Sequence, residues 1–166
     1  KEYSVELMLK PTDNINMSVR TTKEERPGSM QWVGVVEDEN GTNIIYSNVK
    51  RKQTNTELRL NFAFSSKMTF EAYYQPFTVN MDYKDYNRLD EEKSLKVSPY
   101  PYSGNKDFQI DNQVGTFVFR WEYLPGSLIY AVYNLNNNNY YSAEDSEWSN
   151  SKSNSLFLKF DYFFQL

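Results

Sequence analysis

Apolar side chains occupy every second position over long stretches of this chain. From Leu156 to Leu166 each even-numbered residue is apolar, whereas the residues between them are mixed. The same alternation recurs at residues 3–9, 15–19, 58–64, 68–74 and 117–123. A period of two places these apolar side chains on one face of a β-strand, while a helix would scatter them around its circumference. The chain is therefore predicted to be all-β.

The connections between the predicted strands are of two kinds, short and long. Strands are expected at about residues 2–10, 15–37, 44–64, 68–80, 113–124, 127–136 and 153–166. Short turns lie at 11–14, 65–67 and 124–127, and long polar loops at 38–43, 76–112 and 136–154. Strict alternation of short and long connections is typical of outer-membrane β-barrels, which have short periplasmic turns and long extracellular loops. The fold predicted is therefore an antiparallel transmembrane β-barrel.

The turn at residues 65–67 also predicts a register. Pairing across it brings apolar residues together on one face, whereas a slip by one residue would set them opposite charges. The expected pairs are Phe64–Met68, Phe62–Phe70, Leu60–Ala72 and Leu58–Tyr74. The turn at Pro125–Gly126 leaves two registers open. A two-residue turn would point Leu128, Tyr130 and Val132 outward, and a three-residue turn would point Ile129, Ala131 and Tyr133 outward.

Composition removes most enzymatic classes. The 166 residues suffice for one domain and include no cysteine and no histidine, which excludes a disulfide scaffold, a thiol nucleophile and a Ser–His–Asp triad. A sequence pI of about 5.0 argues against nucleic acid as a partner. The mean hydropathy is −0.75, and no stretch approaches the roughly 18 apolar residues that a spanning helix requires. A barrel is not excluded, because its strands alternate lipid-facing and lumenal residues.

The number of predicted strands indicates whether the predicted barrel is complete. Single-chain bacterial barrels have an even number of strands, and seven is odd. Residues 1–166 are therefore expected to be the C-terminal part of a larger barrel, incomplete at its N-terminal side. The alternative is an eighth strand within residues 23–37, which would complete a small barrel. Charges at 23–26 and 50–52 indicate that the second and third strands project beyond the membrane.

Four motifs carry a resemblance to a known family. They are TELRLN at residues 56–61, YQPF at 74–77, FRWEYLPGS at 119–127 and FLKFDY at 157–162. In this order they resemble a family of large outer-membrane proteins of Bacteroidota, catalogued as a domain of unknown function. Members have a carbohydrate-binding-module-like domain before a C-terminal barrel. The resemblance implies a barrel segment in the bacterial outer membrane and implies no catalytic function.

The C-terminal strand resembles the signal that the barrel-assembly machinery reads by pairing with an exposed edge strand. The usual signal ends on an aromatic residue, whereas here Phe164 is followed by Gln165 and Leu166. The machinery is therefore an expected partner, together with outer-membrane lipid and other surface or barrel subunits.

Charged residues within the strands form the first candidate site. On the side opposite the apolar residues they would make a lumenal ladder, which either selects solutes or braces the barrel interior. The ladder consists of Arg59, Glu71, Arg120, Glu122, Lys159 and Asp161. Acidic groups at 90–92 and 144–147 lack the spacing of a glycosidase or calcium site, so no catalytic residue, metal or cofactor is expected.

Aromatic residues in the expected loops form the second candidate site. Tyr100 and Tyr102, in the sequence SPYPY, are predicted to form an extracellular contact patch. Taken together, the sequence predicts a non-catalytic outer-membrane barrel that acts as a channel or as the membrane anchor of a surface complex. The alternatives are a soluble β-barrel that binds a ligand and a surface carbohydrate-active protein.

Overall fold

All regular structure in the described part of the chain is β-strand. The computed structural model describes residues 1–39, 41–91, 94 and 96–164. Its strands are β1 (Glu2–Thr12), β2 (Ile15–Asp38), β3 (Gly41–Ser65), β4 (Met68–Leu89), β5 (Val97–Pro99), β6 (Phe108–Leu124), β7 (Ser127–Ser142), β8 (Glu147–Lys152) and β9 (Ser155–Asp161). The prediction of an all-β, antiparallel fold is confirmed. In the described residues no helix has the length and apolar character needed to cross a membrane.

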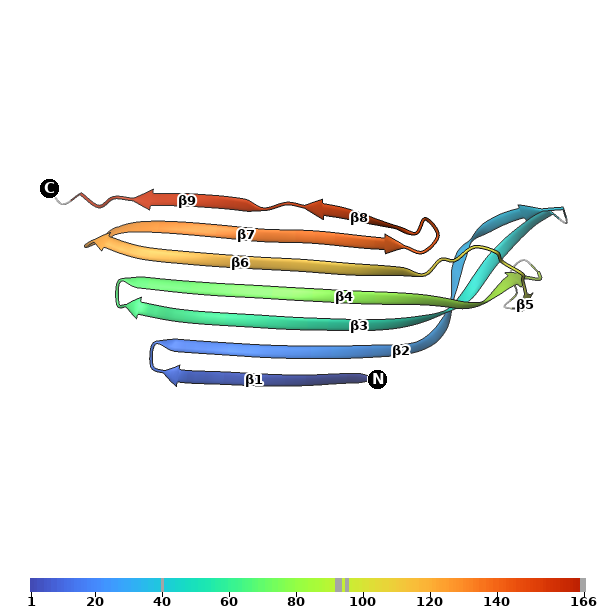
Figure 1. Ribbon diagram of the computed structural model, residues 1–166, viewed down its shortest axis with the longest axis horizontal. Helices are drawn as coiled ribbons and strands as arrows, with labels where there is room; N and C mark the ends of the chain where they lie inside the picture. The colour runs from blue at the N-terminus through green and yellow to red at the C-terminus, as the bar shows by residue number, and fades with distance from the viewer. Residues whose placement is uncertain (40, 92–93, 95, 165–166) are drawn as a thin grey trace.

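The strands form a single sheet in which neighbours in sequence are neighbours in space (Figure 1). The order is β1-β2-β3-β4-β6-β7, and both β8 and β9 pair with β7. β9 follows the half of β7 next to the turn at residues 125–126, and β8 follows the other half, so the two together make a seventh row. β5 adds a short pairing to the far end of β4. The sheet is open, with β1 at one edge and β8–β9 at the other.

The connections lie on two opposite rims of the sheet (Figure 1). The turns at residues 13–14, 66–67 and 125–126 share one rim, here called the turn rim. The opposite rim, here called the loop rim, holds the tip of the β2–β3 hairpin, the β4–β6 connection and the turn after β7. The predicted short turns thus gather on one side, as the alternation of connection lengths requires.

The long loops predicted at 38–43, 76–112 and 136–154 are wrong in extent. β4 continues to Leu89, β6 begins at Phe108, and β7 runs to Ser142. The run 136–139 looked like a loop because it is all asparagine, yet Asn137 pairs with Gln113 on one side and with Lys152 on the other. Backbone hydrogen bonds to two neighbouring strands outweigh the low strand propensity of asparagine.

The register predicted across the β3–β4 turn is confirmed along most of the hairpin. Phe62 pairs with Phe70 and Leu60 with Ala72, but a bulge at the turn sets Ser65 rather than Phe64 opposite Met68. At the β6–β7 turn, Trp121 pairs with Ile129. This register places Ile129, Ala131 and Tyr133 on the same face as Phe117, Phe119 and Trp121. Of the two open alternatives, it is the one that groups Ile129, Ala131 and Tyr133 with the apolar residues of β6.

An eighth strand within residues 23–37 is excluded, since these residues belong to the continuous strand β2. β2 and β3 are 24 and 25 residues long, and their distal part bends across the end of β4 (Figure 1). Register shifts lie between Arg26 and Ser29 and between Trp32 and Gly34, and Asp85 on β4 has a φ of 56°. Bulges of this kind bend a strand and increase its twist.

Little of this sheet is buried. The solvent-accessible surface is 11683 Å², whereas a compact monomer of this mass exposes about 8,600 Å². Among the described residues only Ile45, Val49 and Val79 are buried apolar side chains. They lie in the β2–β3 hairpin and the adjoining part of β4, near the loop rim. Over the rest of the sheet both faces are open, so a dry core does not account for its stability.

Gly126 offers a test of the β6–β7 turn. Its φ is +76°, and an added Cβ would lie 3.1 Å from Cβ of Phe163. Gly126→Ala should therefore cost about 1–3 kcal/mol, measured as a lower urea midpoint by circular dichroism. The control is Gly34→Ala, because a Cβ there meets no atom within 4 Å. Equal midpoints for the two variants would contradict the turn geometry.

Candidate functional site

One face of the sheet carries a continuous band of apolar side chains across all seven rows. The register connects them strand by strand, for example from Leu9 through Met17, Leu60 and Ala72 to Phe117. We call this band the apolar belt and its side of the sheet the belt face. The belt consists of Val5, Leu7, Leu9, Met17, Val19, Leu58, Leu60, Phe62, Met68, Phe70, Ala72, Tyr74, Phe117, Phe119, Trp121, Ile129, Ala131, Tyr133, Leu156, Leu158 and Phe160.

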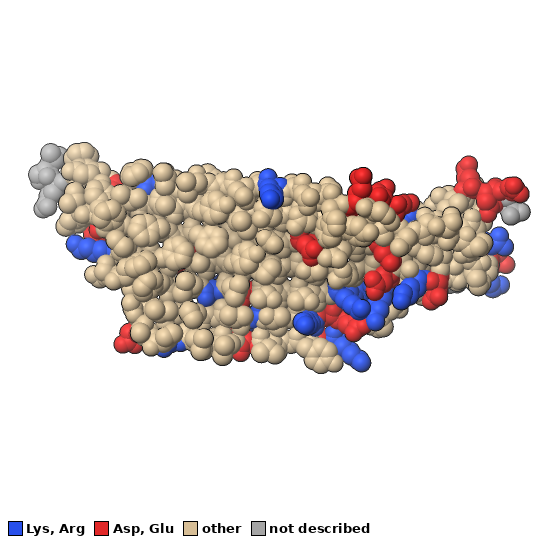
Figure 2. Space-filling view, in the orientation of Figure 1, with Lys and Arg blue, Asp and Glu red and all other residues tan. Residues whose placement is uncertain are grey.

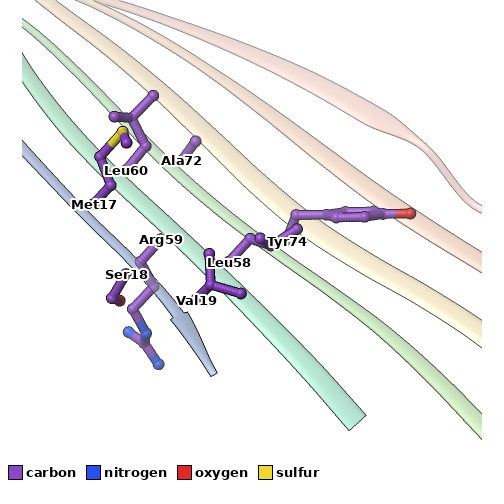
Figure 3. A pocket seen from close by; sticks show the side chains of 8 residues that line it. All are labelled: Met17, Ser18, Val19, Leu58, Arg59, Leu60, Ala72 and Tyr74. Carbon is purple, nitrogen blue, oxygen red and sulfur yellow. The ribbon is translucent and has the colours of Figure 1, made fainter. Parts of the chain in front are cut away.

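The belt is an exposed surface rather than a core. Leu156, Leu158 and Phe160 on β9 are 63%, 59% and 66% exposed. Where Ala72 has only a methyl group, the belt has a shallow hollow of about 270 Å³ (Figure 3). Figure 3 shows Met17 and Leu60 on one side of the strands, while Arg59 extends to the other. Charged and apolar side chains of one strand therefore leave the sheet in opposite directions.

The six residues of the predicted charge ladder all lie on the face opposite the belt. Arg59 pairs with Tyr73, Glu71 with Val118, and Arg120 with both Thr69 and Tyr130. Lys159 also pairs with Tyr130, and Leu128 pairs with both Glu122 and Asp161. The register thus gathers side chains from β3, β4, β6 and β9 on this opposite face, at the level of the belt.

The ladder residues contact their neighbours in a way that the sequence did not indicate. Their ion pairs run along single strands: Arg59 lies 3.4 Å from Glu57, and Lys159 lies 2.9 Å from Asp161. Across strands they meet aromatic rings instead. The guanidinium of Arg59 lies 4.7 Å from the centre of the Tyr73 ring, and the ammonium of Lys159 lies 5.7 Å from that of Tyr130. Such contacts bind a cation to the face of a ring.

Glu122 has a different role from the other ladder residues. Its carboxylate Oε1 accepts a hydrogen bond of 3.0 Å from the backbone N–H of Gly126. The contact lies within the β6–β7 turn and stabilises it. This carboxylate therefore supports the turn rim and does not pair with a cation of the ladder in the described residues.

The polarity of the two faces reverses towards the loop rim. On β4 the belt face changes from Ala72 and Tyr74 to Thr78, Asn80 and Asp82. The opposite face becomes apolar over the same stretch, and there it has a hollow of about 420 Å³ between β2, β3, β4 and β6. The apolar side chains lining this hollow are Val49, Phe77, Val79, Met81, Phe108 and Ile110. The sheet thus has two zones of opposite polarity along its strands.

Tyr100 and Tyr102, the predicted contact patch, both make contacts within the chain. The hydroxyl of Tyr100 donates to Oδ2 of Asp38 at 3.0 Å, which ties the β4–β6 connection to the β2–β3 hairpin. Desolvation, and then this carboxylate, raise the pKa of Tyr100. The ring of Tyr102 lies 4.7 Å from that of Tyr86. Both tyrosines are half-buried, so they present less surface to a partner than the sequence suggested.

We call Tyr86, Tyr100 and Tyr102 the tyrosine cluster, and its links to Lys106 and Glu144 were missed from the sequence. The hydroxyl of Tyr86 accepts a hydrogen bond of 3.1 Å from the backbone N–H of Lys106. The ammonium of Lys106 in turn donates to Glu144 in the turn after β7, and this hydrogen bond raises the pKa of Lys106. Tyr86 was assigned to a loop, and 38 positions separate Lys106 from Glu144. No local signal links residues so far apart.

The acidic groups considered as metal or catalytic sites stay apart. In the described ranges no three His, Cys, Asp or Glu side chains come together as metal ligands. Glu92 of the 90–92 group lies outside the described residues, as do Gln165 and Leu166 of the proposed assembly signal. Phe164, which precedes them, is 76% exposed.

The contact between Tyr86 and Tyr102 should hold the β4–β6 connection in place. Tyr102→Ala removes an aromatic pair of about 0.5–1.5 kcal/mol, so trypsin should cut at the exposed Lys96 about two- to tenfold faster. A time course read by mass spectrometry measures this rate. Tyr3→Ala is the control, because Tyr3 lies on the edge strand β1 and is 67% exposed. The same rate in both variants would show that the ring contact does not order the connection.

The chain belongs to a family whose members share a domain of unknown function. The family model, described as Domain of unknown function (DUF5916), matches residues 1–165 and so covers nearly the whole chain. The comparison with curated proteins gives no match, and neither does the comparison with solved structures.

Proposed function

We propose that this member of the DUF5916 family forms part of a β-barrel in the outer membrane of Bacteroidota. In this proposal the barrel is a channel or the membrane anchor of a cell-surface complex, and the chain itself is not catalytic. The observation that carries the proposal is the apolar belt, which crosses all seven rows without a charged side chain. Lipid favours such a surface, since exposing apolar side chains to water costs free energy.

The dimensions of the belt fit a membrane. On β4 the alternating apolar residues run from Met68 to Tyr74, which is six steps of about 3.4 Å and therefore roughly 20 Å along the strand. The apolar band of outer-membrane barrels is about 25 Å tall and is bordered by aromatic residues. Here Phe64 and Trp121 lie near the turn rim, and Tyr3 and Tyr74 lie at the other end of the belt. Figure 2 shows a broad area with few charged side chains next to a more charged region towards the loop rim.

The soluble alternative requires the opposite arrangement. A water-soluble barrel packs apolar side chains inside and exposes its charges. If the belt were that interior, its side chains would fill the barrel and the charged face would be wet. The reversal towards the loop rim argues against this arrangement, because there the opposite face becomes apolar and holds the buried Val49 and Val79. The buried apolar side chains near the loop rim lie on the face opposite the belt. A single barrel interior can contain them only if the belt faces outward.

The edges of the sheet fit the same proposal. In lipid every backbone N–H and C=O must find a partner within the protein, so a spanning sheet has to close. β1 and β9 lie at the two edges of this sheet, and each pairs on one side only. In the proposed barrel their free edges pair with further strands.

In the proposed barrel, the side chains of the face opposite the belt line the lumen. At the level of the belt this face carries both cations and carboxylates, and the observed contacts join them within strands or to neighbouring rings. Those contacts favour bracing of the wall over selection of solutes by charge. A surface carbohydrate-active protein is the less supported alternative, because the described carboxylates form no paired site of the kind used in glycoside hydrolysis.

Adjacent residues on β3 allow a matched test of which face meets lipid. Leu60→Arg places a charge in the belt and should cost about 2–4 kcal/mol in a bilayer, which would remove most of the protein from the membrane. Asn61→Arg, the control, adds the same side chain on the opposite face beside its cross-strand partner Glu71 and should be tolerated. The measurement is the amount of the natural full-length polypeptide that stays in outer membranes washed with alkaline carbonate.

The two variants separate the alternatives. Loss of Leu60→Arg together with retention of Asn61→Arg supports the barrel. The reverse result would mean that the charged face is the outer one, as in a protein anchored by other means. Release of the unmodified protein by carbonate would overturn the membrane assignment altogether.

A further inference from the structure

Three lysines lie on the belt face beyond the belt, towards the loop rim, and on β2 and β3 Thr21, Thr56 and Thr54 lie between them and the belt. Lys23 pairs with Tyr3 and with Thr54, two positions along from the pair Val5 and Thr21. The next positions of the same face are Lys52, which pairs with Glu25, and Lys50, which pairs with Asp82. We call Lys23, Lys50 and Lys52 the lysine cluster. Its place is set by the same register that aligns the belt.

The charges in this region are unbalanced. The ammonium of Lys50 lies 2.5 Å from Glu25, and the hydrogen bond to Lys50 lowers the pKa of Glu25. Lys52 and the side chain of Lys1 act on the same carboxylate only through space. Among the described residues neither Lys23 nor Lys52 forms an ion pair, and both are exposed. The three lysines face two carboxylates, Glu25 and Asp82, so a net positive charge remains here on a chain whose net charge is −4.

The cluster also borders a hollow. A depression of about 260 Å³ lies between β1, β2 and β3 and is lined by Tyr3, Lys23, Glu25, Lys52 and Thr54, among others. It combines an aromatic ring, the ammonium groups of Lys23 and Lys52, a hydroxyl and the carboxylate of Glu25, which Lys50 neutralises. Figure 2 shows basic side chains, with acidic ones among them, gathered where β1–β3 approach the loop rim. The ammonium and hydroxyl groups of this set are groups that bind phosphate by charge and hydrogen bonds.

We propose that Lys23, Lys50 and Lys52 form a site for the phosphate groups of a glycolipid in the outer leaflet of the membrane. The inference rests on the proposed function, because it needs the belt to face lipid. Phosphates of membrane lipids lie at the boundary between hydrocarbon and water, and the lysine cluster lies at the end of the belt where that boundary falls. The long hairpins mark this rim as the extracellular one. Basic groups close to an anionic membrane surface each add to binding.

The position also explains why the lysines are on this face. On the opposite face they would point into the barrel, where Arg26 and Glu24 already form an ion pair of 2.6 Å. On the belt face they point toward the lipid that surrounds the barrel. The hollow beside Tyr3 holds a bound headgroup at a fixed place between the strands. Exposed charges without a hollow would attract only a diffuse layer of counterions.

The test measures lipid binding by the full-length polypeptide in detergent, using native mass spectrometry. The probes are lipid A with two phosphates, its form with one phosphate, and phosphatidylethanolamine. We expect the affinity to be highest for lipid A with two phosphates and lower for its form with one phosphate. The double variant Lys23→Gln/Lys52→Gln should bind the doubly phosphorylated lipid about 25-fold more weakly, at about fivefold for each lysine removed. The control Lys10→Gln/Lys67→Gln makes the same change in charge at the turn rim and should bind as the unmodified protein does.

Each outcome decides the inference. Equal binding of the three lipids, or equal loss in both double variants, would overturn it. Inorganic phosphate is added as a competitor, and displacement of the lipid by millimolar phosphate would assign the site to the free ion instead. Carbonate washing of membranes that contain the Lys23→Gln/Lys52→Gln variant separates the two proposals. A variant that stays in the membrane without binding the glycolipid would still support the barrel, while a protein released by carbonate even when unmodified would end both.

Discussion

The register between neighbouring strands is the constraint on which every surface of this protein depends. Side chains alternate along a strand, so a slip of one residue in any pair would move a whole row of apolar groups to the wrong face. Six successive pairings keep the same alternation in phase from β1 to β9, and the result is one apolar belt. The belt, the charged face opposite it and the lysine cluster beyond it are consequences of that single alignment.

The energetics of the sheet differ from those of a water-soluble domain of this size. Backbone hydrogen bonds hold the rows together, and the few buried side chains near the loop rim make a small local core. Most of the apolar surface is left for the surroundings to cover. The bulges near Pro27 and Asp85 bend the projecting hairpin over the end of the sheet, and this bend is what encloses Val49 and Val79. Packing is therefore concentrated where the strands extend past the belt.

The alternation of apolar residues predicted much of this architecture. It located seven rows, the turns of one rim and most of the β3–β4 register, because those depend on local pattern and turn chemistry. It failed at residues 136–139, where pairing on both sides overrides the composition of an asparagine run. It also placed the six charged residues of the ladder on one face. It did not show that Arg59 and Lys159 contact Tyr73 and Tyr130, since such contacts depend on side-chain direction across strands.

The reversal of polarity is present in the sequence, because the apolar positions of β4 pass from even numbers up to Tyr74 to odd numbers from Phe77. It was missed because residues 76–112 were assigned to a loop. The tyrosine cluster, by contrast, lies outside the reach of a local pattern. The link from Tyr86 through Lys106 to Glu144 joins three segments that no spacing rule connects. In a polar stretch, the sequence does not distinguish charged and aromatic residues that contact each other from those that face solvent.

The nearest-neighbour order of the strands has a consequence for how such proteins change over evolutionary time. Each hairpin pairs only with the hairpins beside it and carries its own section of the belt at the same depth. Duplication or loss of one hairpin would widen or narrow the sheet while leaving the level of the belt on the other hairpins unaltered. A lineage of these proteins can thus vary the width of its sheet in steps of two strands and keep the belt continuous.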